Sequence, residues 1–278
     1  MKVNELIKSR IEYLNCAPLK EIVGVPTGFI NIDKKIGGFK QGELIIIGGR
    51  PGMGKSTFAI QMAIQISQAM HKVLYINLNT SRECMANKLI AQLEDISLDE
   101  LQNGTFKNNP EVDINSAIAS SEKLNLSVVE DCFKMDDFEG IVNEEKPEIV
   151  IIDFLELMTA SEVKKRKDLD AVVKAMKRIA RENGIVIIAL NQLRKNLLNR
   201  HGDCKPQLED LTGNGIIEES ASKVILLYRP EYYDITEDCY GNSVVGLMEA
   251  NMVLNKYGKP SVFNFKVNRN FTCYTSWN

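Results

Sequence analysis

The stretch that most constrains this chain is Gly49-Arg-Pro-Gly-Met-Gly-Lys-Ser56, which fits the pattern GxxxxGK[ST]. It follows the apolar run ELIIIG and precedes a segment with helical periodicity, about residues 55–70. Glycines let the backbone wrap closely around an anion, and the helix N-terminus adds positive potential. In this context we favour a phosphate-binding loop over an incidental glycine-rich turn. The loop residues are Gly49, Arg50, Pro51, Gly52, Met53, Gly54, Lys55, Ser56 and Thr57. Lys55 is expected to reach the β and γ phosphates of ATP, and Ser56 to bind Mg²⁺.

Apolar runs and amphipathic segments alternate along the rest of the chain. Strands are expected at about 43–48, 72–78, 126–131, 148–157, 184–193 and 222–229, and helices at about 81–97, 135–146 and 168–183. Two further strands, 246–256 and 261–268, are joined by the turn YGKP, which indicates an antiparallel edge. This order predicts an α/β fold with a mostly parallel twisted sheet, helices on both faces and antiparallel C-terminal edge strands.

The N-terminal segment is expected to be a separate amphipathic helix. Val3, Leu6, Ile7, Ile11 and Leu14 fall on one helical face, and Pro18, Gly24 and Pro26 then interrupt the pattern. We expect a linker helix and connection over residues 1–23, followed by an ATPase domain over 24–278. The helix could dock on its own domain or on a neighbouring subunit.

Composition argues against several classes of protein. The net charge is −3, so any nucleic-acid site has to be a local patch. The six cysteines form no CxxC pair and there are only two histidines, which makes a zinc site unexpected. No stretch approaches the ~18 apolar residues of a membrane span, and the N-terminus lacks the apolar core of a signal peptide. We therefore expect a cytoplasmic protein with no membrane partner.

Two polar residues end apolar strands on the edge where the phosphate loop is expected. Asp153 ends IVIID, and a carboxylate at that position of a parallel strand faces the ligand crevice, where it would hold Mg²⁺ through water. Gln192 ends VIIALNQ and could sense the γ-phosphate and relay its presence to the next loop. The alternative for Gln192 is an amide that only binds backbone.

Four segments together resemble the C-terminal motor domain of DnaB-type replicative helicases. They are GVPTGFINIDKKIGGFKQGELIIIGGRPGMGKST, IVIIDFLELM, IIALNQLRK and DLTGNGIIEESASKVILLYRPEYYD, in one order over roughly residues 24–274. The resemblance implies a RecA-like P-loop NTPase core and a homo-oligomeric ring of about six subunits. It also implies ATP at the subunit interfaces and single-stranded DNA in the central hole.

The chain departs from the family at positions that carry chemistry. Asn79 stands where the family has the glutamate that polarises the attacking water, and Thr212 stands where it has an arginine. Lys256 stands where the family has a finger arginine that reaches the adjacent subunit's ATP. General-base help is worth roughly 10²–10⁴-fold in rate, and a finger arginine roughly 10³–10⁵-fold. We therefore expect ATP and Mg²⁺ to bind but hydrolysis to be impaired, unless Glu156, or Glu83 one helical turn past Asn79, supplies the base.

The resemblance places DNA-contacting loops at about 159–168 and 194–215. Basic and glycine residues there suit sequence-independent phosphate binding; the alternative is a charged, solvated loop. The candidate residues are Lys164, Lys165, Arg194, Arg200, Lys205, Gly213, Asn214 and Gly215.

Two functions fit these features. The first is a DnaB-like replicative DNA helicase domain that acts on single-stranded DNA. The second is a catalytically degenerate paralogue whose ATP binding gates assembly, loading or regulation of a partner helicase or another replication protein. Another RecA-like ATPase is a third reading, against which GVPTGF and the last third of the chain argue.

Overall fold

The computed structural model describes residues 3–5, 7–8, 11, 24–108, 114–160, 168–194 and 205–277. Across these residues the chain forms a nine-stranded sheet with the order β3-β2-β4-β5-β1-β6-β7-β8-β9. The strands are β1 Leu44–Gly49, β2 Val73–Asn77, β3 Leu126–Glu130, β4 Ile149–Asp153, β5 Val186–Gln192, β6 Lys223–Tyr228, β7 Leu247–Asn255, β8 Ser261–Val267 and β9 Tyr274–Ser276. Strands β1 to β6 pair in parallel, and β7, β8 and β9 continue the sheet antiparallel. The predicted α/β sheet with an antiparallel C-terminal edge is confirmed.

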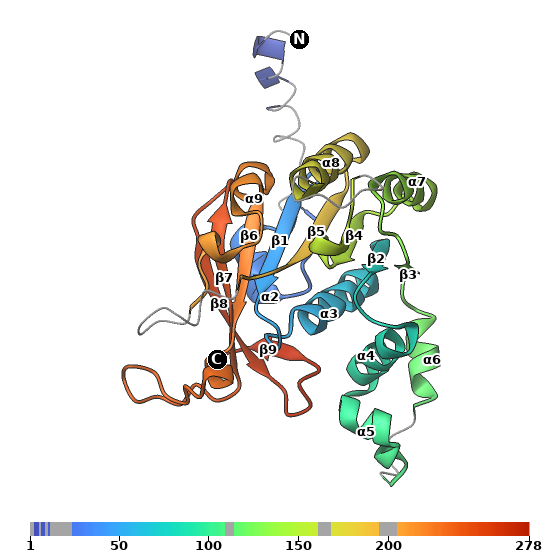
Figure 1. Cartoon of the computed structure of the whole chain (residues 1–278), viewed down its shortest axis with the longest axis vertical. Coiled ribbons are helices and arrows are strands. Elements are labelled where there is room, and N and C mark those ends of the chain that lie inside the picture. Colours follow the sequence, from blue (N-terminus) through green and yellow to red (C-terminus); the bar gives the residue numbers. More distant parts are fainter. Residues whose placement is uncertain are drawn as a thin grey trace.

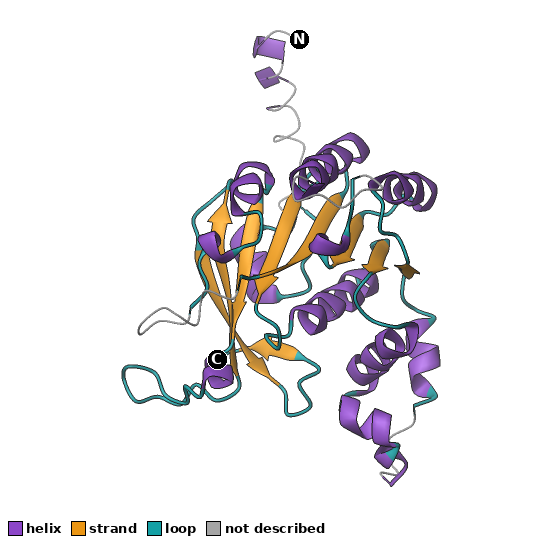
Figure 2. Cartoon of the chain, viewed as in Figure 1, coloured by secondary structure: helices purple, strands orange, loops and turns teal. Residues whose placement is uncertain are grey.

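Helices cover both faces of the sheet, as Figure 2 shows. Helices α2 (Ile30–Ile36) and α3 (Lys55–Gln68) pack on one face, and α7 (Met135–Glu145), α8 (Asp168–Asn183) and α9 (Asn214–Ser220) pack on the other. Every residue of β1, β2 and β4 is buried. Strands buried on both faces need continuous apolar sequence, which is why these runs do not alternate.

Some elements could not be anticipated from periodicity. Helix α4 (Arg82–Glu94) is followed by α5 (Leu98–Asn103), a 3-10 helix (Thr105–Asn108) and α6 (Ser116–Ser121), which lie beyond the sheet in Figure 1. The three elements after α4, together with α2 and α9, are one or two turns long, too short for a helical repeat and marginal without tertiary contacts. The strand expected over 148–157 ends at Asp153, because Leu155–Leu157 form a 3-10 helix.

The described residues of the N-terminal segment, 3–5, 7–8 and 11, are helical. Val3, Ile7 and Ile11 are exposed by 73%, 51% and 50%, so this apolar stripe is not covered by its own chain. The other predicted stripe residues, Leu6 and Leu14, lie outside the described residues. The division at residue 23 remains a prediction. Among the helices that the structure describes, none is both long and apolar enough to cross a membrane.

Candidate nucleotide-binding site

A cavity of about 550 Å³ opens beside the phosphate loop, where β1, β4 and β5 end. The phosphate loop contributes Pro51, Gly52, Gly54, Lys55, Ser56 and Thr57 to its lining. The remaining lining residues are Asn79, Lys88, Leu98, Phe154, Gln192, Arg229, Phe271 and Tyr274. The predicted loop residues and the predicted strand-end residues Asn79 and Gln192 thus meet at one site.

The phosphate loop is shaped by close contacts that require glycine. Gly54, the N-cap of α3, has φ 84°, and a Cβ there would lie 1.9 Å from the hydroxyl oxygen of Tyr274. Gly52 has φ 80°, and a Cβ there would lie 2.6 Å from Cε2 of Tyr232. Two tyrosines from the C-terminal third of the chain, Tyr232 and Tyr274, therefore pack against the loop.

The side chain of Lys55 is buried against the phosphate loop to which it belongs. Its Nζ donates hydrogen bonds to the carbonyl oxygens of Gly49, at 2.7 Å, and Arg50, at 3.1 Å. Burial lowers the pKa of Lys55 to about 8, while the negative charges of Glu156 and Asp153 oppose this shift. An incoming phosphate would replace the carbonyl partners with a full negative charge and favour the ammonium form.

Asp153 has the unsatisfied oxygen that a cation site needs. The carboxylate is 2% exposed, and its Oδ2 accepts a hydrogen bond from the hydroxyl of Tyr75 at 2.9 Å. Its Oδ1 is buried and has no hydrogen-bond partner among the described residues. Burial raises the pKa of Asp153, against the effect of the Ser56 and Tyr75 side chains that face it. Oxygen ligands of this kind suit Mg²⁺, so Ser56 and Asp153 fit the predicted metal; when bound, Mg²⁺ neutralises charge on the β and γ phosphates.

Gln192 connects the cavity to the loop that follows β5. Its side chain lines the cavity, and its backbone carbonyl accepts a hydrogen bond from Thr212 Oγ1 at 3.1 Å. Asn191 Nδ2 in turn donates to the carbonyl of Thr212 at 3.1 Å, and Leu193 pairs with Leu211 in an isolated bridge. The two ends of the predicted second DNA loop are therefore tied together beside the cavity.

No carboxylate is among the described residues that line the cavity. Asn79 is exposed there, at the position where the family's glutamate is expected. Glu156 lies behind the end of β5, where its Oε1 accepts a hydrogen bond from the backbone N–H of Gln192 at 2.6 Å. Burial raises the pKa of Glu156, and its Oε2 is buried without a hydrogen-bond partner in the described part of the chain.

Lys256 lies at the ends of the strands that face away from the cavity. It follows β7, whose last residue, Asn255, pairs with the first residue of β6, so about 20 Å of strand separates it from the cavity. Its Nζ donates to the carbonyl of Glu219 and its N–H to that of Ser222. Within one chain Lys256 cannot reach the cavity, so its predicted role requires a second copy.

The candidate DNA residues are described only in part. Lys164, Lys165 and Arg200 lie outside the described residues. Arg194 is exposed, whereas Lys205 Nζ contacts both carboxylate oxygens of Glu249 at 2.9 Å.

The glycines of the same loop lie around the start of α9. Gly213, with φ 75°, precedes α9, Asn214 is its first residue, and the space where a Cβ of Gly215 would lie is open.

Six cavity-lining residues were not predicted from the sequence: Lys88, Leu98, Phe154, Arg229, Phe271 and Tyr274. The guanidinium of Arg229 lies 4.7 Å from the centre of the Phe271 ring. The only signal in the sequence was the segment YRPEYYD, which carried family resemblance but no stated chemistry. The hydroxyl of Tyr75 was also missed, although a tyrosine inside the aliphatic run KVLYINL could have suggested a buried polar partner.

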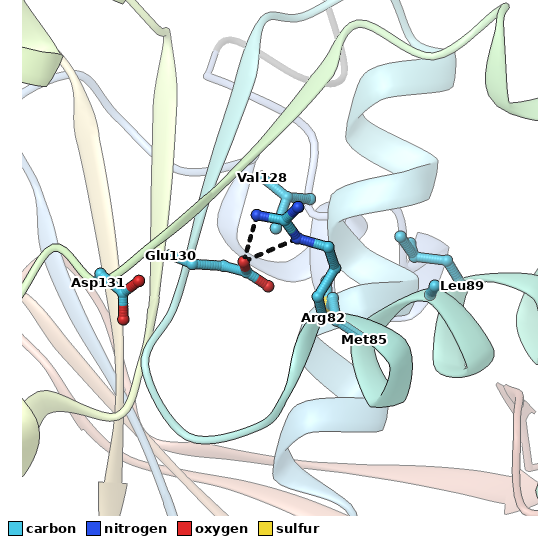
Figure 3. A pocket seen from close by; sticks show the side chains of 7 residues that line it. Arg82, Met85, Leu89, Val128, Glu130 and Asp131 are labelled. Carbon is cyan, nitrogen blue, oxygen red and sulfur yellow. Dashed lines mark hydrogen bonds and ion pairs between the residues drawn. The ribbon is translucent and has the colours of Figure 1, made fainter.

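A second cavity, of about 380 Å³, lies between α4 and the edge strand β3 (Figure 3). Nε and one terminal guanidinium nitrogen of Arg82 each lie 3.1 Å from Glu130 Oε2. Met85, Leu89 and Val128 supply its apolar lining. It shares no lining residue with the cavity beside the phosphate loop.

The family model described as DnaB-like helicase C terminal domain matches residues 24–276 of the chain. The chain belongs to this family. The replicative DNA helicase DnaB of Helicobacter pylori is 28% identical to this DnaB-like chain over 244 residues, covering 84% of the chain and 50% of the relative. The DnaB of Haemophilus influenzae is 30% identical over 262 residues, covering 85% and 54%. The chain thus spans about half the length of these relatives.

Solved structures confirm the fold of this DnaB-like domain. One of them, an ATPase domain, superposes with a TM-score of 0.88 at 23% identity, covering 100% of this chain and 99% of that one. A DnaB-like replicative helicase, studied for its interactions with primase, superposes with a TM-score of 0.87 at 23% identity, covering 100% and 67%. The predicted RecA-like core is therefore correct.

Proposed function

We propose that this chain is the ATP-binding motor domain of a DnaB-like replicative DNA helicase, that it acts on single-stranded DNA, and that it hydrolyses ATP slowly. The observation that carries this proposal is the cavity in which the phosphate loop, Asn79 and Gln192 meet, with the carboxylate of Asp153, whose Oδ1 is unsatisfied, next to Ser56 of that loop. These groups come from four separate stretches of sequence, and a structural turn would not need to bring them together.

Binding of ATP is supported by groups suited to its phosphates. The backbone N–H groups of the loop and the α3 N-terminus favour an anion, and Lys55 adds a cation. Ser56 and Asp153 would hold Mg²⁺. Gln192 lines the same cavity, and its backbone is tied to Thr212, so a change at the γ-phosphate has a hydrogen-bonded route to the second DNA loop.

Slow hydrolysis follows from the residues that face the cavity. The Asn79 amide can orient a water molecule but cannot accept its proton. Glu156 holds the backbone N–H of Gln192 and does not line the cavity. Without a general base, turnover is expected to fall by roughly 10²–10⁴-fold relative to an enzyme that has one.

Asn79 also favours a second candidate function. In a paralogue that regulates or loads a partner helicase, ATP binding would suffice, so the lack of a general base at position 79 would not impair its function. The deciding experiment measures ATP turnover with and without single-stranded DNA, beside an Asn79→Glu variant. DNA-stimulated turnover that rises in the variant supports the motor, whereas tight ATP binding with no turnover under any condition supports the paralogue.

Oligomerisation and DNA contact are supported by different residues. Val3, Ile7 and Ile11 form an exposed apolar stripe that a second copy could cover. Lys256 lies too far from its own cavity to act in it, as expected for a group that serves a neighbouring subunit. We propose a homo-oligomeric ring with single-stranded DNA held by loop lysines and arginines.

A further inference from the structure

We propose that Tyr75 is a positioning residue for the cation site: its hydroxyl holds one carboxylate oxygen of Asp153, so that the other oxygen stays free for Mg²⁺. This inference rests on the proposed binding of ATP with Mg²⁺. It extends the site from the groups that would touch the cation to a side chain that acts through one of them.

The register of two neighbouring strands is the first observation. Strand β2 pairs with β4 in parallel, with Tyr75 opposite Ile151 and Asn77 opposite Asp153. Side chains two positions apart on a strand point to the same face of the sheet, so Tyr75 and Asp153 lie diagonally on one face. The hydroxyl of Tyr75 donates a hydrogen bond to Asp153 Oδ2 at 2.9 Å. The pairing of β2 with β4 therefore sets this contact.

The burial of the Tyr75 hydroxyl is the second observation. Tyr75 is 0% exposed and belongs to the core layer that contains Ile151 and Ile188. A phenylalanine ring would fill such an apolar position, so packing alone does not account for the hydroxyl. Burial, together with the nearby charge of Asp153, raises the pKa of Tyr75. The hydroxyl therefore keeps the proton that it donates.

The third observation is that the two oxygens of Asp153 differ. Oδ2 is satisfied by Tyr75, whereas Oδ1 is buried and has no hydrogen-bond partner among the described residues. A buried carboxylate is costly to ionise without a hydrogen bond, and one with both oxygens engaged would have none to offer. The side chain of Ser56 faces Asp153 from the phosphate loop. Tyr75 thus supplies the hydrogen bond that the carboxylate needs without occupying Oδ1.

A backbone contact fixes the same two strand ends. The N–H of Leu78, directly after β2, donates to the carbonyl oxygen of Asp153 at 2.8 Å. Strand β2 and the residue that follows it therefore hold Asp153 by its main chain and by its side chain. Partners that orient a metal ligand from behind are worth roughly 10–100-fold in metal affinity or activity. Tyr75 is placed to have this effect on Asp153.

The test measures how much Mg²⁺ strengthens ATP binding. Calorimetry on the whole chain gives the ATP affinity with Mg²⁺ and with EDTA, and the ratio of the two is the contribution of the cation. In Tyr75→Phe, which removes only the hydroxyl, this ratio is expected to fall about tenfold, with the affinity in EDTA within about twofold of wild type. Tyr228→Phe is the matched control, because Tyr228 is a buried tyrosine of β6 that does not line the cavity. Its ratio is expected to equal that of the wild type.

Asp153→Asn tests whether Tyr75 acts through Asp153. Asparagine lacks the charge that attracts Mg²⁺, so this variant is expected to lose most of the contribution of the cation. Adding Tyr75→Phe to it is expected to cause no further fall, because two residues that act through one contact have effects that do not add. A further fall in the double variant would show that Tyr75 acts elsewhere and would overturn the positioning role.

Equal weakening of ATP binding with Mg²⁺ and with EDTA in Tyr75→Phe, or no change in either, overturns the inference and leaves the nucleotide site intact. The same fall of the ratio in Tyr228→Phe also overturns it, as does a wild type that binds ATP equally well with Mg²⁺ and with EDTA. Failure of the wild type to bind ATP under either condition overturns the proposed nucleotide function, and the role of Tyr75 with it.

Discussion

The backbone N–H of Gln192 donates a hydrogen bond of 2.6 Å to the carboxylate of Glu156. This contact joins the end of β5 to the 3-10 helix after β4, so it ties together two strand ends beside the cavity. The carboxylate that could have replaced the missing base is thereby engaged in positioning a strand.

From this contact we expect Glu156→Gln to change ATP turnover by less than about threefold. Glutamine keeps an oxygen that can accept the hydrogen bond from the backbone N–H of Gln192. It cannot act as a base, so its turnover shows whether Glu156 has that role. Glu156→Ala leaves that N–H without its acceptor and should lower stability by about 1–3 kcal/mol, seen as a lower melting temperature. A loss of turnover of about a hundredfold in Glu156→Gln would instead identify Glu156 as the general base.

Asn79→Glu is expected to raise turnover by roughly 10²-fold or more, because it places a proton acceptor among the lining residues of the cavity. Adding Lys256→Arg should raise it further in the assembled protein, since arginine binds phosphate with a two-pronged fork that lysine lacks. The effects of the two substitutions need not add, because the carboxylate at position 79 and the guanidinium at position 256 would act on the same transition state. Steady-state phosphate release measures both, with ATP affinity as the control. If neither variant exceeds the wild type, the loss of activity has another origin.

Lys55→Ala is expected to abolish ATP binding, measured by calorimetry. Burial lowers the pKa of Lys55 to about 8 in the free site, and a bound phosphate raises it. Binding near pH 8 should therefore take up a proton, and affinity should fall as the pH rises through about 8. Titrations in two buffers of different ionisation enthalpy report the uptake. A binding enthalpy independent of buffer near that pH contradicts this assignment.

Single-stranded DNA is expected to bind weakly, without sequence preference and less tightly as salt increases. Charge reversal of Lys164, Lys165 and Arg200 should remove binding in fluorescence anisotropy. Reversal of Lys205 should matter less, because Glu249 already neutralises its charge. Binding that survives reversal of all four residues would exclude these loops.

Deletion of residues 1–18 is expected to lower the mass of the oligomer. The described part of the first helix exposes Val3, Ile7 and Ile11 to solvent, and a neighbouring subunit would bury them. Light scattering with ATP present compares the full chain with the deletion. Replacing these three residues by serine, which removes the stripe without shortening the chain, should have the same effect. Equal masses for all three proteins would contradict a role in assembly.

Local sequence alone determined the elements that build the core. The bounds predicted for α8, residues 168–183, agree with the structure because a long amphipathic helix repeats one pattern over several turns. The phosphate loop could be assigned because its glycines, lysine and serine act within one short segment. Asp153 and Gln192 could be placed on one edge because parallel strands end together.

Tertiary structure decided what lies between these elements. Tyr75 bonds Asp153 from 78 positions away, Asp95 anchors Asn268 from 173, and Arg229 lies over Phe271. No local pattern encodes these contacts, because they depend on the path of the chain and on how the antiparallel strands β7, β8 and β9 bring the C-terminus back to α3 and α4. The sequence therefore determined the phosphate half of the site, whose residues are close in the chain or placed by strand ends. Tertiary structure alone forms the remaining wall of the cavity, because its residues come from distant segments that must pack together. The hydrogen bond from the Gln192 N–H to Glu156 depends on the same packing.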